Sequence, residues 1–471
     1  MNLKIKLVGL LLLLCNTMYA QTINTFEFSL QQAIEYALQN QNAVKNAKLD
    51  KQISEQKIKE TIAIGLPQVN GKATAQKFLD IPTQVIPNFI SPSVYGVLID
   101  NNVKDGNGNP IKMPAGGYNN IEAKFGTTFN MSYGVDVSQL IFDGSYLVGL
   151  QATNVYKDLT VKALERTQNE ARVAVTKAYY AVLVVQKSKE LLDANVTRLK
   201  KTLDDTKAYY DNGFAEKIDV DRLTVIYNNI VTERENLERV YLITANLLKF
   251  QMGMPIESGL ILTDKLDEVL ALETIPLEAA NVQARVEYQL VKTQMRLMEL
   301  DYKRNIFSRM PTVAAFGTFS KNAQNNDYAK LTDKLFPTSI VGLSVTIPLV
   351  GSGKKFYQTN QAKLVYEKSK NDLKNLENAL SLESKSAQTN FKNSSGQLKN
   401  QSKNMELATE VLRVAKIKYN QGVGSSLEVV SAETALKEAE NNYIAALYNY
   451  KMELQLVQNQ THQTKLKCIQ T

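Results

Sequence analysis

The residue types that most often carry chemistry are scarce in this sequence. His462 is the single histidine, and Cys15 and Cys468 are the two cysteines. A tetrahedral metal site needs about four ligands from His, Cys or carboxylate side chains, and a Ser–His–Asp triad needs a histidine beside its nucleophile. The sequence contains no glycine-rich phosphate loop, paired-carboxylate signature or cofactor fingerprint. We therefore expect a protein that is not an enzyme and that binds neither a cofactor nor a metal ion.

Two acidic residues stand out because each occupies the same place in a repeated motif. The motif is a tyrosine, a glycine three residues later, and an acidic residue and a valine after that glycine. Its two copies are Tyr210, Gly213, Asp219 and Val220, and Tyr419, Gly422, Glu428 and Val429. Glycine readily adopts the left-handed conformation that ends a helix, and an acidic side chain in a first helical turn is stabilised by the helix dipole. The motif therefore predicts a helix end, a tight turn and a new helix. Ser425 and Ser426 are expected to cap the second of these new helices.

Apolar residues return at spacings of three and four on both sides of each motif, as in the seam of a coiled coil. Around the second motif they are Met405, Ala408, Leu412, Ala415 and Tyr419, then Val429, Ala432, Leu436, Ala439, Tyr443, Ala446 and Tyr450. Around the first they are Val196, Leu199, Leu203, Thr206 and Tyr210, then Val220, Leu223, Tyr227, Ile230, Leu237, Tyr241 and Leu248. One offset aligns both arms of the two copies. The sequence therefore predicts two antiparallel helical hairpins related by internal duplication.

Four other stretches alternate apolar and polar residues with a period of two, which is typical of strands with two different faces. They are Gln68–Lys77, Lys124–Phe142, Thr312–Ser320 and Thr338–Leu349. A long loop rich in Pro, Gly and Asn, roughly residues 79–120, separates the first two. Further helices are expected over 28–62, with Ser29 as N-cap, over 145–210 as one helix or two stacked helices, over 277–308 and over 354–419. Each half then has the order helix, two strands, two long helices.

The first twenty residues have the features of a secretory signal peptide. Lys4 and Lys6 precede a short apolar run that is too short to span a bilayer as a helix. Cys15 leaves a lipoprotein open as an alternative, although the bulky Leu14 directly before it argues against lipidation. Removal of the two lysines changes the formal net charge from +8 to +6. Basic and acidic residues are interspersed along the helices, so we interpret this surplus as solvated helix faces and expect no nucleic-acid partner.

The alternating strands fit either a soluble sandwich or a membrane barrel, with the apolar face turned toward a core or toward lipid. One apolar face carries the aromatic residues Phe125, Phe129 and Tyr133, and continues through Ile141. The polar faces carry Lys72, Asn130 and Asp136, which suit a wet lumen. An open sheet edge in lipid leaves backbone groups without partners, and the smallest membrane barrels have about eight strands. Four strands must therefore be joined by those of other copies, in a number that spacing alone does not fix.

The signal peptide, the duplicated order of elements and the repeated turn motif resemble the TolC-type outer membrane efflux proteins. The opening stretch Leu30–Leu38 is also similar to the first helix of that family. The resemblance implies a mixed α/β membrane protein with long antiparallel coiled-coil hairpins, and a homotrimer whose four strands per chain form a 12-stranded transmembrane β-barrel. It further implies a periplasmic helical tunnel, no cofactor, and partners that comprise a periplasmic adaptor and an inner-membrane transporter. The expected function is the outer membrane exit duct of a tripartite efflux pump or a type I secretion system.

The resemblance also assigns functional residues. It places the pore constriction at Asp219, Glu428, Tyr210 and Tyr419, and the turns that dock the adaptor at Gly213, Gly422, Val220 and Val429. Family members can carry a basic residue just beyond the second glycine, but this chain has Val423-Gly424-Ser425 there. The family's second acidic position is Ser431 here. These departures argue against a salt-bridged latch and a double acidic ring.

Two other protein classes share some of these features. A secreted coiled-coil structural protein would lack the alternating strands or show them in one block, and a periplasmic adaptor subunit would carry one helical hairpin. On the preferred interpretation the chain divides into a signal peptide (1–20), a first repeat (21–274), a second repeat (275–460) and a C-terminal tail (461–471). The long loop at 79–120 is then extracellular, because such barrels place long loops outside the cell.

Overall fold

The computed structural model describes residues 25–116, 119–266 and 281–468. The predicted signal peptide with Cys15, the predicted repeat boundary at 274/275 and the side chains of His462 and Cys468 lie outside the described part. The chain divides into two compact units. Unit 1 comprises Met1–Lys57, Ala152–Asp301 and Gln361–Thr471, and unit 2 comprises Ile58–Gln151 and Tyr302–Asn360. The four boundaries between these segments fall inside helices.

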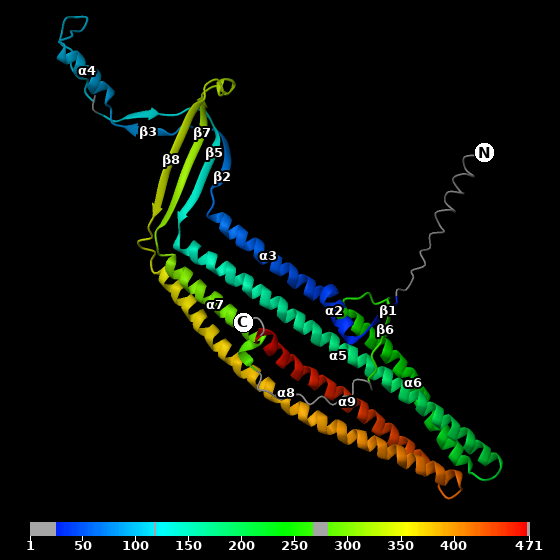
Figure 1. Cartoon of the computed structure of the whole chain (residues 1–471). Helices are drawn as coiled ribbons and strands as arrows, with labels where there is room; N and C mark the ends of the chain where they lie inside the picture. Colours follow the sequence, from blue (N-terminus) through cyan, green and yellow to red (C-terminus); the bar gives the residue numbers. More distant parts are fainter. Residues whose placement is uncertain (1–24, 117–118, 267–280, 469–471) are drawn as a thin grey trace, which may run out of the picture. The chain divides into compact units, whose positions relative to one another are not determined.

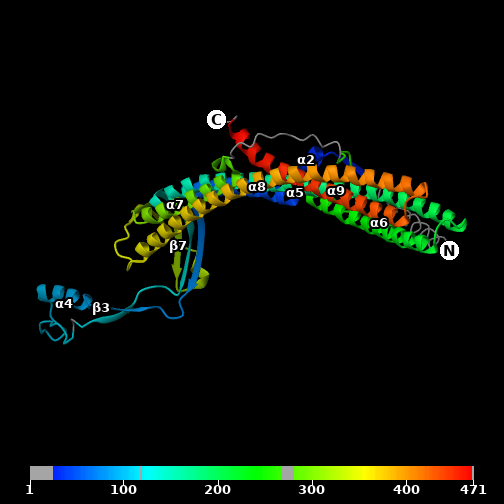
Figure 2. The same ribbon diagram turned by 90° about the horizontal axis from the view of Figure 1, so that it is seen from below.

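Long helices dominate the chain (Figures 1 and 2). They are α2 (Leu30–Asn40), α3 (Asn42–Ile64), α5 (Gly144–Asp211), α6 (Lys217–Met252), α7 (Val286–Phe307), α8 (Lys354–Asn420) and α9 (Ser426–Cys468). The pairs α5/α6 and α8/α9 are the two predicted hairpins, and both turn at the predicted glycines. α5 is one helix of 68 residues, not two stacked helices. The helix expected from residue 277 begins at Val286, after a short 3-10 turn, η2 (Val282–Ala284).

The first predicted helix is interrupted, contrary to the expectation of a continuous helix over 28–62. Ser29 caps α2 in a capping box with Gln32, as its position in the sequence predicts. The helix then breaks at Gln41, whose backbone is extended. At this point Gly253, which ends α6 in the left-handed conformation, lies so close that an added Cβ would be 2.8 Å from both Asn40 O and Gln41 Cα. Close backbone packing accompanies this break, and the local sequence carries no helix breaker there.

Unit 2 contains an antiparallel sheet with the order β2–β5–β7–β8 (Figure 1). Its strands are β2 (Gln68–Lys77), β5 (Phe129–Phe142), β7 (Thr312–Asn325) and β8 (Phe336–Thr346). Residues that face each other across neighbouring strands share a side of the sheet. The register therefore collects one apolar side from all four strands: Val69, Ala73, Tyr133, Val135, Val137, Ala315, Phe319, Val341, Leu343 and Val345. The opposite side carries Lys72, Thr74, Ser132, Asp136, Thr318, Ser320, Asn322 and Ser344.

Several details of the predicted strands are wrong. The third strand continues beyond Ser320 to Asn325, and the fourth covers Phe336–Thr346 and so ends before Leu349. The strand expected from Lys124 starts at Phe129, so Phe125 and Thr127 are outside it. The register shifts between Leu140 and Phe142, which places Phe142 opposite Val313. Ile141 is therefore the extra residue of a bulge and does not continue the apolar face, because a bulge breaks the period of two.

The expected long loop between β2 and β5 is partly structured. It contains β3 (Thr83–Ile86), which pairs with β4 (Ile121–Lys124) as a separate two-stranded sheet, and the helix α4 (Ile90–Asp100) between them. Between β7 and β8 lies a short 3-10 helix, η3 (Tyr328–Lys330). None of the helices in the described part of the chain combines the length and the hydropathy needed to cross a membrane.

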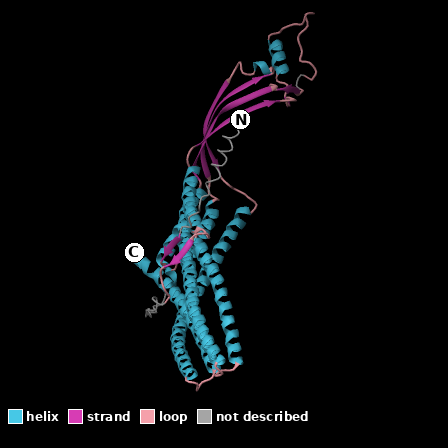
Figure 3. Ribbon diagram, turned by 90° about the vertical axis from the view of Figure 1, so that its right-hand side faces the viewer, coloured by secondary structure: helices cyan, strands magenta, loops and turns pink. Residues whose placement is uncertain are grey.

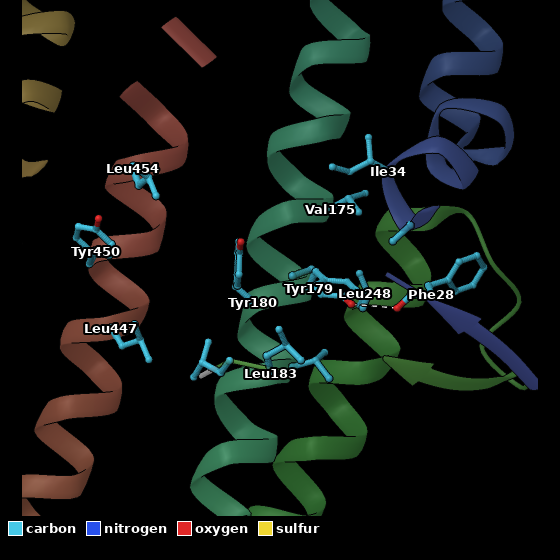
Figure 4. Close-up of a cluster of buried hydrophobic side chains, with 14 of the residues drawn as sticks. Phe28, Ile34, Val175, Tyr179, Tyr180, Leu183, Leu248, Leu447, Tyr450 and Leu454 are labelled. Carbon is cyan, nitrogen blue, oxygen red and sulfur yellow. Dashed lines mark hydrogen bonds between the residues drawn. The ribbon is translucent and has the colours of Figure 1, made fainter. Parts of the chain in front are cut away.

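The core of unit 1 forms where α5 meets α2, α6 and α9 (Figure 4). Strands β1 (Thr25–Phe28) and β6 (Gly259–Leu262), which the sequence pattern did not reveal, pair in parallel beside it. Tyr179 of α5 is fully buried, and its hydroxyl lies 3.0 Å from Phe28 O and 2.9 Å from Asp264 Oδ2. The same carboxylate oxygen accepts the backbone N–H of Leu30 at 2.8 Å. One hydroxyl thus ties α5 to the end of β1 and to the chain after β6.

We expect Tyr179→Phe to lower the free energy of unfolding by about 1–3 kcal/mol, because it removes the buried hydroxyl that bonds to Phe28 O and to the Asp264 carboxylate. Denaturant unfolding followed by circular dichroism measures this loss. Tyr156→Phe is the matched control, since Tyr156 lies on the same helix with its side chain 41% exposed. Equal stability of the two variants would contradict the assigned role of the Tyr179 hydroxyl.

Candidate functional site at the hairpin turns

The two hairpin turns have the same backbone geometry, and they lie at the same end of the helical unit (Figure 3). Gly213 and Gly422 both adopt φ of 77°. The amide of Gly213 donates to Tyr210 O at 2.9 Å and that of Phe214 to Tyr209 O at 2.8 Å. The second turn repeats both bonds at 3.0 Å each, from Gly422 to Tyr419 O and from Val423 to Lys418 O. Both turns are therefore Schellman motifs, in which a left-handed residue closes the helix.

Of the residues that the resemblance assigned to docking, Gly213 and Gly422 are exposed at the turns, whereas the two valines pack inside the hairpins. Val429 is 1% exposed and packs inside the second hairpin, and Val220 packs against the apolar cluster of the first. The residues that follow the two glycines, Phe214 and Val423, are 84% and 75% exposed. The valines thus stabilise the hairpins, whereas Phe214 and Val423 present apolar surface at the turns.

The two acidic residues of the motif have different surroundings. Asp219 Oδ1 accepts a hydrogen bond from Ser426 Oγ, at the start of α9, and lies 3.3 Å from Arg222 Nη1. Asp219 therefore links the first hairpin to the second. Glu428 is exposed on α9, and its backbone N–H donates to Ser425 Oγ at 3.2 Å. Within the described part of the chain, no hydrogen bond or ion pair of the Glu428 carboxylate is observed.

The two tyrosines also differ. Tyr419 Oη lies 2.9 Å from Thr206 Oγ1 of α5, and its ring meets that of Tyr209 edge-on with centroids 6.0 Å apart. Burial raises the pKa of Tyr419 above its ordinary value. Tyr210 is 42% exposed and makes no such cross-hairpin bond among the described residues. Thr206, Tyr209 and Ser426 are thus members of the site that sequence reasoning did not assign. The sequence does mark Thr206, because it is a polar residue at a position of the coiled-coil seam that is otherwise apolar or aromatic.

Farther from the turns, the hairpins are joined by buried charges. Arg198 of α5 lies 3.5 Å from Glu433 Oε2 and 3.7 Å from Glu440 Oε1, both on α9. Lys416 of α8 reaches the other oxygen of Glu433 at 2.5 Å. The Glu433 carboxylate is only 3% exposed, so water screens these charges weakly. A further ion pair, Lys437 with Glu233, connects α9 to α6.

Together these contacts form a polar seam between the two hairpins, defined here by Asp219–Ser426, Thr206–Tyr419, Arg198 with Glu433 and Glu440, and Lys437–Glu233. Thr206–Tyr419 is a neutral hydrogen bond, worth about 0.5–1.5 kcal/mol net, whereas hydrogen bonds to charged groups contribute about 1.5–3 kcal/mol. The described residues include no cluster of three or more His, Cys, Asp or Glu that could hold a metal ion.

A groove next to Glu428 gives the second hairpin an apolar outer surface. It is lined by residues of α8 and α9, with the apolar side chains of Val411, Val414 and Leu427 beside Lys418 and Glu428. Val411 and Leu427 are 56% and 55% exposed. This surface lies beside the turn and within one hairpin.

Comparisons with known proteins agree with this architecture. Residues 280–459 match the family described as outer membrane efflux protein. The outer membrane protein TolC of Vibrio cholerae is 22% identical over 325 residues, which cover 68% of this chain and 74% of that protein. The structure of VceC from Vibrio cholerae matches with a TM-score of 0.66 at 15% identity, over 92% of this chain and 95% of VceC. The Campylobacter jejuni CmeC outer membrane channel matches with a TM-score of 0.70 at 14% identity, over 92% and 85%. The predicted resemblance is confirmed, and the fold is that of these outer membrane channels.

The buried charges give the helical unit a defined pH dependence. Burial raises the pKa of the Glu440 carboxyl above its ordinary value of 4.5. The folded chain then binds this proton more readily than the unfolded chain, so stability is lost as pH rises from 4.5 through the folded-state pKa. We expect Glu440→Gln to flatten this part of a plot of melting temperature against pH. The exposed Glu438→Gln is the matched control and should keep the slope of the unaltered protein; identical slopes in both variants would contradict the assignment.

Proposed function

Starting from the confirmed resemblance to the TolC-type outer membrane efflux proteins, we propose that this chain is the outer membrane exit duct of a tripartite efflux pump. It lies in the outer membrane of a Gram-negative bacterium and extends into the periplasm through its helices. A type I secretion system is an alternative user of the same duct. The secreted structural protein and the adaptor subunit fit less well, because the chain has two helical hairpins and strands from both halves.

One observation carries this proposal. The four-stranded sheet has a mainly apolar side and a mainly polar side, and its outer strands β2 and β8 each have one edge without a partner among the described residues. On the apolar side, Val341 and Leu343 are 79% and 71% exposed. Lipid accommodates the apolar side, but it cannot hydrogen-bond the free edges. Pairing of β2 with β8 of the next copy removes every edge.

Three copies give a closed barrel of twelve strands, which exceeds the minimum of about eight for a membrane barrel. The polar side then lines a wet lumen, with Lys72, Asp136 and Ser344 among its residues. The same order of elements in both halves supports an origin by internal duplication. The hairpins of the three copies form the wall of the periplasmic tunnel.

The exposed apolar surface at the turns supports docking of a periplasmic adaptor, which delivers substrate from an inner-membrane transporter. Phe214 and Val423 follow the turn glycines Gly213 and Gly422 and are exposed, and a second apolar surface is the groove with Val411 and Leu427. Large exposed apolar side chains grouped in this way mark an interaction site.

The turns also contain the proposed constriction. In a trimer, three exposed Glu428 carboxylates surround one axis and concentrate cations there. Asp219 contributes less to this field, because it already pairs with Ser426 and Arg222. Tyr419 holds the hairpins together through Thr206, while Tyr210 remains at the surface.

The membrane assignment is tested by placing an arginine on either side of one strand. We expect Leu343→Arg to reduce trimer stability by about 2–4 kcal/mol if it lies near the bilayer midplane. Ser344→Arg, its neighbour on the lumen side, should be tolerated. Folded trimer in outer membrane extracts is measured by its heat-modifiable migration on a gel. Equal tolerance of the two arginines, or a detergent-free monomer, would refute the proposal.

The gate is tested by single-channel recording of reconstituted protein. Glu428→Ala should shift the reversal potential in a salt gradient toward the non-selective value, and Asp219→Ala should shift it less. Tyr419→Phe should raise the conductance of the closed state, because the bond to Thr206 is lost. Tyr210→Phe is the control and should behave as the unaltered channel. Unchanged selectivity and conductance in all variants would place the constriction elsewhere.

A further inference from the structure

The segment between β2 and β5 contains an apolar surface that is exposed within the described part of the chain. We call residues 79–124, with β3, α4 and β4, the arm. No charged residue lies between Asp80 and Asp100. None of the α4 residues is buried. Ile90, Val94 and Val97 share one helix face at the spacing i, i+4, i+7, and are 53%, 51% and 63% exposed.

The arm has little to stabilise it by itself. A helix of 11 residues is marginal in water, and a lone two-stranded hairpin is also marginal. The N-cap of α4 is Phe89, which forms no side-chain cap, and Phe89 itself is 61% exposed. Burial of an apolar face is the usual source of stability for a short helix. The exposed apolar face of α4 therefore needs a partner surface that buries it if the helix is to be stable.

The position of the arm in the chain indicates which surface this is. The arm follows directly from β2, the edge strand that pairs with the next copy in the proposed barrel. Each boundary between copies therefore carries one arm. In a trimer the three uncharged α4 faces are tethered to one barrel, which gives them a high effective concentration for one another. An uncharged face complements another uncharged face, whereas an anionic lipid headgroup calls for basic residues, which are absent between Asp80 and Asp100.

The chain is long enough for the three helices to meet. Twelve residues lead from Lys77 to Phe89, which corresponds to at most about 40 Å of extended chain. Twelve strands spaced about 4.8 Å apart and tilted by about 40° enclose a cylinder with a radius of roughly 12 Å. The reach of each arm thus exceeds the distance from the barrel wall to its axis.

We infer that the α4 helices of the three copies pack against one another through Ile90, Val94 and Val97 and join the copies at the end of the barrel that carries the arms. This inference rests on the proposed trimer. It adds a contact between copies that is separate from the sheet and the hairpins. The occupant of each exposed α4 face is thus another copy of α4.

The absence of tryptophan from the chain allows a direct test on the full-length protein in detergent. Val94→Trp introduces a single emitter on the proposed contact face, and Asn107→Trp places one in the exposed polar part of the same arm. In trimers verified by mass, Val94→Trp should emit at shorter wavelength than Asn107→Trp and resist quenching by acrylamide. Emission and quenching like those of Asn107→Trp would overturn the inference, as would quenching by a brominated detergent, which would identify the membrane as the occupant.

Cross-linking identifies the partner. Val97→Cys, with Cys15 and Cys468 replaced by serine, should give linked dimers with a short bismaleimide at protein concentrations where trimers do not associate. The additional change Val94→Asp should abolish this product while the trimer persists. A trimer without linked arms, or links only between separate trimers, would overturn this inference and leave the proposed function intact. Absence of any trimer would overturn both.

Discussion

The unpaired edges of β2 and β8 impose the main constraint on this protein. Each edge is a row of backbone donors and acceptors, and in hydrocarbon each unmet group costs several kcal/mol. The sheet cannot avoid this cost by staying in water, because its apolar side favours lipid. In lipid the edges still require a hydrogen-bonding partner. Closure with other copies satisfies both demands at once. The lumen, the trimer and the convergence of the hairpins all follow from this closure in the proposed duct.

The helical unit uses a different balance of forces within and between hairpins. Within each hairpin, apolar residues such as Leu203 and Leu223, or Leu412 and Leu436, are almost fully buried. Between the hairpins, the contacts near the turns combine hydrogen bonds, such as Asp219–Ser426 and Thr206–Tyr419, with the edge-on ring contact of Tyr419 and the packing of Val430 against the first hairpin. Separating two helices of one hairpin would expose apolar side-chain area to water, which is unfavourable. Polar groups that separate can instead form hydrogen bonds to water. In the proposed duct, we expect the hairpins to move as intact bodies, with the polar seam as the part that opens.

Much of this architecture could be predicted because it depends on local periodicity. Heptad spacing located α5, α6, α8 and α9, and the glycines located both turns, since a left-handed residue is required wherever such a helix ends. The alternation of residues located four strands and their two faces, because side chains in a strand point alternately to opposite sides. The existence and type of these elements are determined by each segment alone, whereas the start of β5 and the bulge at Ile141 depend on the neighbouring strands.

The tertiary structure decided what depends on residues far apart in the chain. Gln41 breaks a helix where Gly253 packs against it, and a bulge at Ile141 changes which side chains face the apolar side. Asp219 and Glu428 occupy equivalent positions in the sequence, yet only Asp219 meets a hydroxyl of the other hairpin. Periodicity fixes which face of a helix or strand is buried, but it contains no information about which neighbour lies opposite. The sequence by itself determined the elements and their faces, and only their packing determined the partners of each polar side chain.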